Sequence, residues 1–197
     1  ILFRGHKQET VELLAKHSGV PVWNGLTDAA HPTQTMADVF TILETFGTLV
    51  GRKVVYVGDG RNNVANSLMI GCAKVGIEFV NCTPSELRPP ESLIAEAETM
   101  GATNSCNITI EHDPVTAVQG ANVIYTDVWI SMGEESKQEE RIALLRPYQV
   151  NMDLMRETGN LDSGDVIFLH CLPAFHDSET EVTREIGELE VSNDVFE

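Results

Sequence analysis

Positive charge and long hydrophobic runs are both scarce in this sequence. The 197 residues carry 30 Asp and Glu against 13 Lys and Arg, which gives a net charge of −17. A chain with that balance lacks the broad basic face that holds a phosphate backbone, so nucleic acid is not an expected partner. No apolar run reaches the ~20 residues that a membrane-spanning helix needs, so we expect no membrane partner either.

Cysteine is also sparse. The four cysteines form no CxxC pair, which is typical of a protein in a reducing cytoplasm rather than of a secreted disulfide scaffold. Residues 1–5 have none of the features of a signal peptide and are predicted to be the end of a strand. We therefore predict a cytoplasmic chain that begins inside a longer protein.

Short apolar runs alternate with helical patterns along most of the chain. Strands of the main sheet are predicted at 53–58, 77–81, 107–110, 121–126 and 166–169. Such alternation is typical of a parallel sheet with right-handed crossovers. We predict an α/β fold with two parts. Residues 1–48 form a remnant of one α/β domain with an interdomain helix, and residues 49–197 form a three-layer, Rossmann-like parallel sheet.

Apolar spacing also predicts individual helices. Residues 8–17 form one helix, whose apolar side consists of Val11, Leu13, Leu14 and Ala15. A short strand at 20–25 follows and closes at Asn24-Gly25. Residues 33–48 form a long helix with five apolar residues at helical spacing: Met36, Val39, Phe40, Leu43 and Phe46. A later helix is expected to run on from the charged stretch 134–141 toward Met155.

The most informative stretch is the predicted buried strand Val166–Leu169, which is followed at once by His170 and Cys171. Ligands bind at the carboxyl ends of parallel strands, where Cys171 would lie. Its thiol has three open roles: nucleophile, weak hydrogen-bond partner or inert buried group, of which the last is the commonest. Activation by His170 or His176 would make a Cys-His hydrolase, but no oxyanion-hole motif accompanies it. These histidines and His31 show no zinc-site spacing, so we predict no metal.

Gly58-Asp59-Gly60 follows a predicted strand, as the glycines of a dinucleotide fingerprint do. Asn63 replaces the third glycine of that fingerprint, and the next strand ends at Asn81 without the acidic residue that holds a ribose. We therefore expect no nucleotide cofactor. Asn62 and Asn63 at a helix start suit a carboxylate or amino ligand, although plain helix capping is the more frequent use of such a turn.

Two further places carry polar groups of chemical interest. Asp127 ends a predicted strand, where a carboxylate binds an ammonium group or accepts its proton, or else merely caps a turn. His31, Thr33 and Gln34 stand at the start of the long helix. The electropositive end of a helix favours anions, so these residues are candidates for binding a phosphate or a carboxylate.

Five motifs, taken together, resemble those of the ornithine carbamoyltransferases in order and approximate spacing. They are Phe3-Arg4-Gly5, His31-Pro32-Thr33-Gln34, Gly58-Asp59-Gly60-Arg61-Asn62-Asn63, Asp127-Val128-Trp129 with Ser131-Met132-Gly133, and His170-Cys171-Leu172-Pro173. The Ser-Met-Gly and His-Cys-Leu-Pro elements are specific to the ornithine enzymes among transcarbamoylases. The resemblance implies transfer of a carbamoyl group from carbamoyl phosphate to the δ-amine of L-ornithine, giving L-citrulline and phosphate without a cofactor, in arginine biosynthesis or the arginine deiminase pathway.

The resemblance also implies a role for each matched residue. Carbamoyl phosphate would be bound by Arg4, His31, Pro32, Thr33, Gln34, Cys171 and Leu172. Ornithine would be bound by Asn63, Asp127, Ser131 and Met132. The catalytic set would be Arg4, His31, Asp127 and Cys171. In this set Cys171 is not a covalent nucleophile: it positions the amine and helps to deprotonate it, while proximity and charge stabilisation supply most of the rate.

This sequence departs from the family pattern at both ends. Family members begin earlier, with a Ser-Thr-Arg-Thr loop that grips the phosphate, and end later, with a last strand and a helix that returns to the first domain. We therefore expect a chain truncated at both ends and inactive alone, and a homotrimer, or a multiple of one, for the full-length protein. The alternative is a non-catalytic fragment or amino-acid-binding module that keeps the ornithine pocket.

Overall fold

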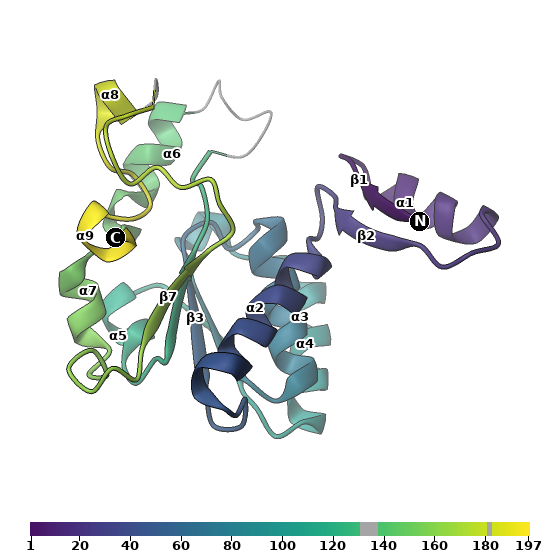
Figure 1. Ribbon diagram of the computed structural model, residues 1–197, viewed down its shortest axis with the longest axis horizontal. Coiled ribbons are helices and arrows are strands. Elements are labelled where there is room, and N and C mark those ends of the chain that lie inside the picture. Colours follow the sequence, from purple (N-terminus) through teal and green to yellow (C-terminus); the bar gives the residue numbers. More distant parts are fainter. Residues whose placement is uncertain (131–137, 181–182) are drawn as a thin grey trace.

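Five parallel strands form the sheet at the centre of the molecule (Figure 1). The structure is a computed structural model that describes residues 1–130, 138–180 and 183–197. In the order β5-β4-β3-β6-β7, the sheet contains β3 (Lys53–Val57), β4 (Glu78–Cys82), β5 (Ile108–Glu111), β6 (Val123–Thr126) and β7 (Ile167–His170). Every neighbouring pair is parallel, so the predicted α/β parallel sheet is confirmed.

Helices cover both faces of this sheet and make the three predicted layers (Figure 1). One face is covered by α2 (Pro32–Phe46), α3 (Asn63–Val75) and α4 (Glu91–Thr103), and the other by α5 (Pro114–Val118) and α7 (Met152–Glu157). Successive residues of a strand point to opposite faces. Val54 and Tyr56 of β3 therefore join the first core, while Val55 and Val57 join the second.

A two-stranded parallel sheet lies apart from the first, at the right in Figure 1. It consists of β1 (Leu2–Arg4) and β2 (Trp23–Leu26), which α1 (Gln8–His17) connects. The predicted closing turn at Asn24-Gly25 is wrong, because both residues lie inside β2. Close packing explains the glycine: a Cβ on Gly25 would lie 2.9 Å from the carbonyl oxygen of Phe3 on the neighbouring strand.

The buried sides of α1 and α2 differ from the predicted ones. In α1 only Val11 is buried, and Leu13 is 49% exposed. The buried side of α2 consists of Thr35, Asp38 and Ile42. Its exposed side includes Met36, Phe40 and Leu43. Val39 and Phe46, two of the five predicted apolar residues, are partly buried against the core. Apolar spacing was therefore right in part, and it missed Thr35 and Asp38 because they are polar but buried.

The predicted continuous helix toward Met155 is also wrong. α6 (Gln138–Leu145) passes into a 3-10 turn, η3 (Arg146–Tyr148), and the chain is then extended at Val150, which pairs with Val191. Pro147 explains the break, because it has no backbone N–H and its ring clashes with the preceding turn of a helix. β7 is half-buried rather than buried, since it lies at the edge of the sheet.

The remaining elements are η1 (Ser85–Leu87), α8 (Thr183–Ile186) and α9 (Asn193–Phe196). None of the helices in the described ranges is both long and apolar enough to cross a membrane.

Candidate active site

A cleft of about 690 Å³ lies between the two-stranded sheet and the carboxyl ends of β3, β6 and β7. Its lining comes from segments far apart in the sequence, from the ends of β1 and β2 to the loop after β7. This edge is where ligands bind in open parallel sheets. Six predicted site residues line it together: Arg4, His31, Asn63, Asp127, Cys171 and Leu172.

His31 stands immediately before α2, and its backbone N–H lies 2.7 Å from the Ser67 hydroxyl, which accepts its hydrogen bond. The residue is only 7% exposed. Burial, and then the guanidinium of Arg4, lower the pKa of His31 below its ordinary value. The imidazole is therefore neutral at pH 7 and offers an N–H donor without a charge.

Asp127 follows β6 directly and is 7% exposed. Its Oδ1 accepts a hydrogen bond from the backbone N–H of the next residue, Val128, at 2.9 Å. Burial raises the pKa of its carboxyl, while His170 on the neighbouring strand and the side chain of Asn62 oppose that rise. A carboxylate with a raised pKa accepts a proton more readily than an exposed one.

Cys171 lies just beyond β7, on the sheet face that α2 and α3 cover. Burial, followed by the carboxylates of Asp127 and Asp38, raises the pKa of its thiol to about 12, against the lowering effect of Arg4. The side chain is therefore a neutral thiol at pH 7. Since the thiolate is the nucleophilic form, this environment does not activate Cys171 for covalent chemistry.

His170 has a partner at each ring nitrogen. Nδ1 accepts a hydrogen bond from the backbone N–H of Leu172 at 2.8 Å, and Nε2 lies 3.3 Å from Oε1 of Glu190. Glu190 is fully buried and also accepts the backbone N–H of Phe175 at 2.6 Å. His170 thus holds the loop after β7, in which Leu172 adopts a φ of 57°. Its nitrogens are occupied, so it is not available as the base that a Cys-His hydrolase requires.

His176, the other candidate base, points away from the cleft. Its ring stacks on Phe196 with centroids 3.7 Å apart, and Nδ1 lies 2.8 Å from Oδ1 of Asn193. Within the described residues, no group of three or more His, Cys, Asp or Glu side chains is placed to hold a metal ion. His31, His170 and His176 therefore do not assemble into the metal site considered from the sequence.

Packing shapes the Gly58–Gly60 turn. A Cβ on Gly60 would lie 2.7 Å from Oδ1 of Asn81 and 2.9 Å from the carbonyl oxygen of Leu87. Asp59 in the same turn forms a buried ion pair with Arg141, in which both side chains are 6% exposed. Because neighbouring groups crowd the turn, it lacks the open backbone that a pyrophosphate needs.

The two asparagines after this turn face different ways. Oδ1 of Asn62 accepts the backbone N–H of Val64 at 2.7 Å and caps α3, which confirms the capping alternative for this residue. Nδ2 of Asn63 donates to the carbonyl oxygen of Thr27 at 2.7 Å. Asn63 thereby joins the start of α3 to the wall of the cleft that follows β2.

Some predicted residues are not placed in the cleft. Those outside its lining are Pro32, Thr33 and Gln34. Thr33 Oγ1 donates to the carbonyl oxygen of Gly25 at 3.1 Å, and Gln34 Nε2 donates to Oδ1 of Asp38 at 2.9 Å. Those outside the described residues are Ser131 and Met132. The binding roles of all five stay predictions.

Sequence reasoning missed the buried charged residues that support the cleft: Asp38, Asp59, Arg141 and Glu190. A usable signal existed for two of them. Glu190 stands between Leu189 and Val191, and Asp38 stands in a helix that is otherwise rich in apolar residues. A charged residue within an apolar run is rarely buried unless it is paired, so such positions indicate a polar contact inside the protein.

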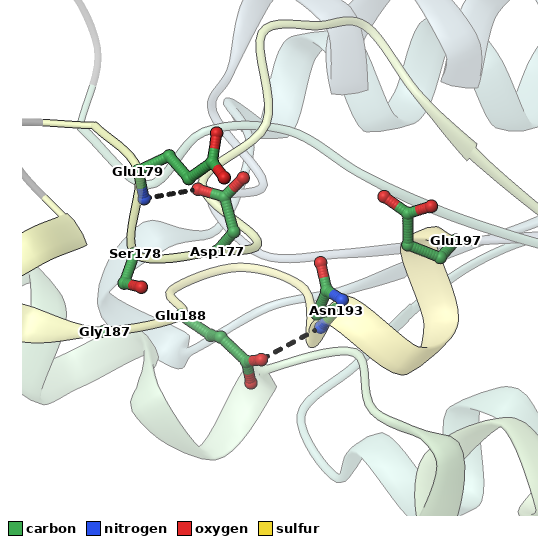
Figure 2. Close-up of a pocket in the computed structure, with 7 residues that line it drawn as sticks. All are labelled: Asp177, Ser178, Glu179, Gly187, Glu188, Asn193 and Glu197. Carbon is green, nitrogen blue, oxygen red and sulfur yellow. Dashed lines mark hydrogen bonds between the residues drawn. The ribbon is translucent and has the colours of Figure 1, made fainter.

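A second, acidic hollow of about 440 Å³ lies near α8 and α9 (Figure 2). Its carboxylates belong to Asp177, Glu179, Glu188 and Glu197. Asp177 accepts the backbone N–H of Glu179 at 2.9 Å, and Glu188 accepts that of Asn193 at 3.1 Å. Dashed lines in Figure 2 mark both contacts. None of the predicted site residues that the structure describes lines this hollow, so the larger cleft is the candidate active site.

Comparison with known proteins identifies the family. Residues 50–197 match the Asp/Orn binding domain of aspartate/ornithine carbamoyltransferases, and residues 1–44 match the carbamoyl-P binding domain. The chain belongs to the aspartate/ornithine carbamoyltransferase family. The resemblance found in the sequence is thereby confirmed. The predicted domain boundary between residues 48 and 49 falls in the gap between the two matched ranges and stays a prediction.

Its relatives include named ornithine carbamoyltransferases. The one from Pseudothermotoga lettingae is 62% identical over 179 residues, which cover 91% of this chain and 56% of the relative. The catabolic one from Bacillus licheniformis is 54% identical over 202 residues, which cover 100% of this chain and 59% of the relative. The solved ornithine carbamoyltransferase from Pyrococcus furiosus superposes with a TM-score of 0.87 at 46% identity, over 100% of this chain and 57% of that one. This chain thus spans less than three-fifths of the length of these relatives.

Proposed function

We propose that the whole protein transfers a carbamoyl group from carbamoyl phosphate to the δ-amine of L-ornithine, giving L-citrulline and phosphate. The observation that carries the proposal is the cleft, where Arg4, His31, Asp127 and Cys171 converge from distant segments. Membership of the carbamoyltransferase family supports it, and so do the names of the ornithine carbamoyltransferases among the relatives.

Arg4 and His31 form the phosphate side of the cleft in this proposal. A guanidinium binds phosphate oxygens through charge-assisted hydrogen bonds. A neutral imidazole donates to the carbonyl oxygen, on which negative charge grows as the amine attacks the carbon. Because burial and Arg4 keep His31 uncharged, it stabilises that oxygen as a donor and keeps its own proton. The backbone of Leu172 adds a contact on this side, and Pro32, Thr33 and Gln34, which lie outside the lining of the cleft in this structure, would have to move to add theirs.

Asp127 and Cys171 form the amine side. The δ-amine of ornithine is protonated at pH 7 and must lose a proton before its nitrogen bonds to the carbonyl carbon and the bond from that carbon to the phosphate oxygen breaks. The buried carboxylate of Asp127 attracts the ammonium and accepts the proton. The neutral thiol of Cys171 positions the amine. Asn63, Ser131 and Met132 hold the amino-acid end.

The charge of the cleft favours ornithine over aspartate as the acceptor. Asp28 and Asp127 both line it, whereas the two arginines of the lining are engaged elsewhere: Arg4 is assigned to the phosphate, and Arg61 pairs with Asp59. A substrate with a second carboxylate is repelled by such groups, whereas a side-chain ammonium is attracted to them. The motifs at 131–133 and 170–173, which resemble those of the ornithine enzymes, support the same acceptor.

A citrulline assay on the natural full-length protein tests the proposal. With carbamoyl phosphate and L-ornithine the wild type should form citrulline, and Asp127→Asn should lower the rate by about 10²-fold or more. Glu98→Gln is the control, because Glu98 is an exposed carboxylate on α4 and does not line the cleft. Its rate should change by less than about threefold. No citrulline from the wild type, or full activity of Asp127→Asn, would overturn the proposal.

We further propose that the full-length protein is a homotrimer, or a multiple of one, in the cytoplasm. Exposed apolar side chains support association: Met36 and Phe40 on α2 are 58% and 59% exposed, and Trp23 on β2 is 55% exposed. The four free cysteines support a reducing compartment. Light scattering on the full-length protein tests the assembly, and a stable, fully active monomer contradicts it.

A further inference from the structure

Asp38 is a buried carboxylate in the middle of α2 that the proposed mechanism does not use. It is 5% exposed. Its Oδ1 accepts a hydrogen bond from Nε2 of Gln34 at 2.9 Å, one turn earlier on the same helix. Its Oδ2 is buried without a hydrogen bond of normal geometry, and the Tyr125 hydroxyl, whose hydrogen bond lowers the pKa of Asp38, is its polar contact on the sheet. Burying a carboxylate with only these two partners, neither of them charged, costs free energy, so stability alone does not account for its presence.

Asp38 faces the sheet beneath Cys171. Tyr125 on β6 and Asp38 lie close enough for each to alter the pKa of the other. Tyr56 on β3 stacks on Tyr125 with ring centroids 6.2 Å apart, and both hydroxyls are buried without a hydrogen bond of normal geometry. Leu169 pairs with Tyr125, and side chains two residues apart share a face. Cys171 therefore lies on the same face as the two tyrosines.

We propose that Asp38 is a positioning residue that links the two predicted halves of the site: Oδ1 holds the amide of Gln34, a predicted carbamoyl phosphate ligand, and the carboxylate contacts Tyr125 on the sheet face that also carries Tyr56 and Cys171. Asp38 comes from the range that matches the carbamoyl-P binding domain, while Cys171 and both tyrosines come from the Asp/Orn binding domain. The carboxylate of Asp38 is thus a buried polar contact between the two parts of the protein.

The ionisation state of Asp38 determines how it holds Gln34. An ionised carboxylate only accepts hydrogen bonds, so it fixes the amide with its nitrogen toward Asp38 and its carbonyl oxygen away. A protonated carboxyl, or the amide of an asparagine, also donates hydrogen bonds, so the orientation of the Gln34 amide is no longer fixed. Burial raises the pKa of Asp38 to about 6. The titratable groups that face it are Tyr125, Asp127 and Cys171 from the sheet and Cys72 from α3.

The reactivity of Cys171 tests the proposal. In Asp38→Asn, alkylation of Cys171 by iodoacetamide at mildly alkaline pH, followed by mass spectrometry of its peptide, should be about three- to tenfold faster, because a negative charge near the thiol is gone. Glu44→Gln is the matched control, since Glu44 is an exposed carboxylate on the same helix. Its rate should stay within about 1.5-fold of the wild type.

A second readout needs only the wild type, so it holds even if Asp38→Asn does not fold. The side-chain NH₂ signals of Gln34 in nuclear magnetic resonance spectra should titrate with a midpoint near the pKa of about 6. If Asp38 served only to bond Gln34 within α2, its replacement would leave the alkylation rate of Cys171 unchanged.

Two results would overturn the proposal: an unchanged alkylation rate in folded Asp38→Asn, or Gln34 signals that do not respond to pH. The role of Asp38 in catalysis rests on the proposed function, because it concerns the same site. Both measurements are made without substrate, so their failure is distinct from a failure to form citrulline.

Discussion

Oε1 of Glu190 lies 3.3 Å from Nε2 of His170, and both side chains are enclosed, with 0% and 2% of their surfaces exposed. The same oxygen accepts the backbone N–H of Phe175 at 2.6 Å. Glu190 also neighbours Val191, which pairs with Val150. One buried carboxylate therefore ties together β7, the loop after it and the segment before α9. Residues of that loop line the cleft.

Glu190→Ala should lower the free energy of unfolding by about 3 kcal/mol or more, because it leaves buried donors on His170 and Phe175 without an acceptor. Urea denaturation followed by circular dichroism measures the change. Glu98→Ala, at an exposed position on α4, is the control and should shift the free energy by less than about 0.5 kcal/mol. Equal decreases in the free energy of unfolding of the two variants would show that the contacts of Glu190 do not stabilise the fold.

Gly60→Ala should destabilise the protein by about 1–3 kcal/mol. The new Cβ would lie 2.7 Å from Oδ1 of Asn81, 2.8 Å from Cγ2 of Thr83 and 2.9 Å from the carbonyl oxygen of Leu87. The last of these is a backbone atom, which cannot rotate aside as a side chain does. Thermal unfolding measures the loss. A variant as stable as the wild type would mean that the turn has room, as a dinucleotide site requires.

Asp38 should make the protein less stable as pH rises from 4 to 7. Burial raises its pKa in the folded state from 3.8 to about 6, so the unfolded chain releases this proton at lower pH than the folded one. The free energy of unfolding therefore falls by up to about 3 kcal/mol between pH 4 and pH 7, because each unit of pKa shift contributes about 1.4 kcal/mol. The stability of Asp38→Asn minus that of the wild type should be larger at pH 7 than at pH 4. Urea midpoints at both pH values check this, and a constant difference would contradict it.

Cys171→Ser should keep measurable citrulline formation in the full-length protein. The raised pKa of Cys171 leaves a neutral thiol, which acts here without bonding to the carbonyl carbon. The loss should stay far below the ~10⁶-fold drop that follows removal of a catalytic nucleophile. Mass spectrometry of the wild type, quenched during turnover with carbamoyl phosphate, should show an unmodified Cys171 peptide. A carbamoylated Cys171 would establish the covalent route instead.

The order of strands and helices was predictable because burial on both faces makes the central strands continuous apolar runs. Val54 to Val57 in β3 show this pattern plainly. The buried side of α2 was not predictable from the same rule. The rule places polar residues outward, whereas Thr35 and Asp38 turn inward to contact α3 and the sheet. Pro147, by contrast, marked a helix end that apolar spacing alone overlooked.

The site residues at strand ends were predictable for a geometric reason. Parallel strands end at one edge, so Asp127 after β6 and Cys171 after β7 had to lie near each other. Glu190 follows no strand of the main sheet, and its contact with His170 depends on how the chain after β7 folds back. No pattern local to the sequence encodes that return, so the support of the loop at Leu172 emerged only from the structure.

Acceptor choice tests the proposed function most directly. The natural full-length protein should be given carbamoyl phosphate with equal concentrations of L-ornithine and L-aspartate, and both carbamoylated products should be quantified in the same reaction. The acidic lining of the cleft at Asp28 and Asp127 predicts citrulline in an excess of about 10³-fold or more. Carbamoyl aspartate as the main product, or the absence of both products, would contradict the assignment.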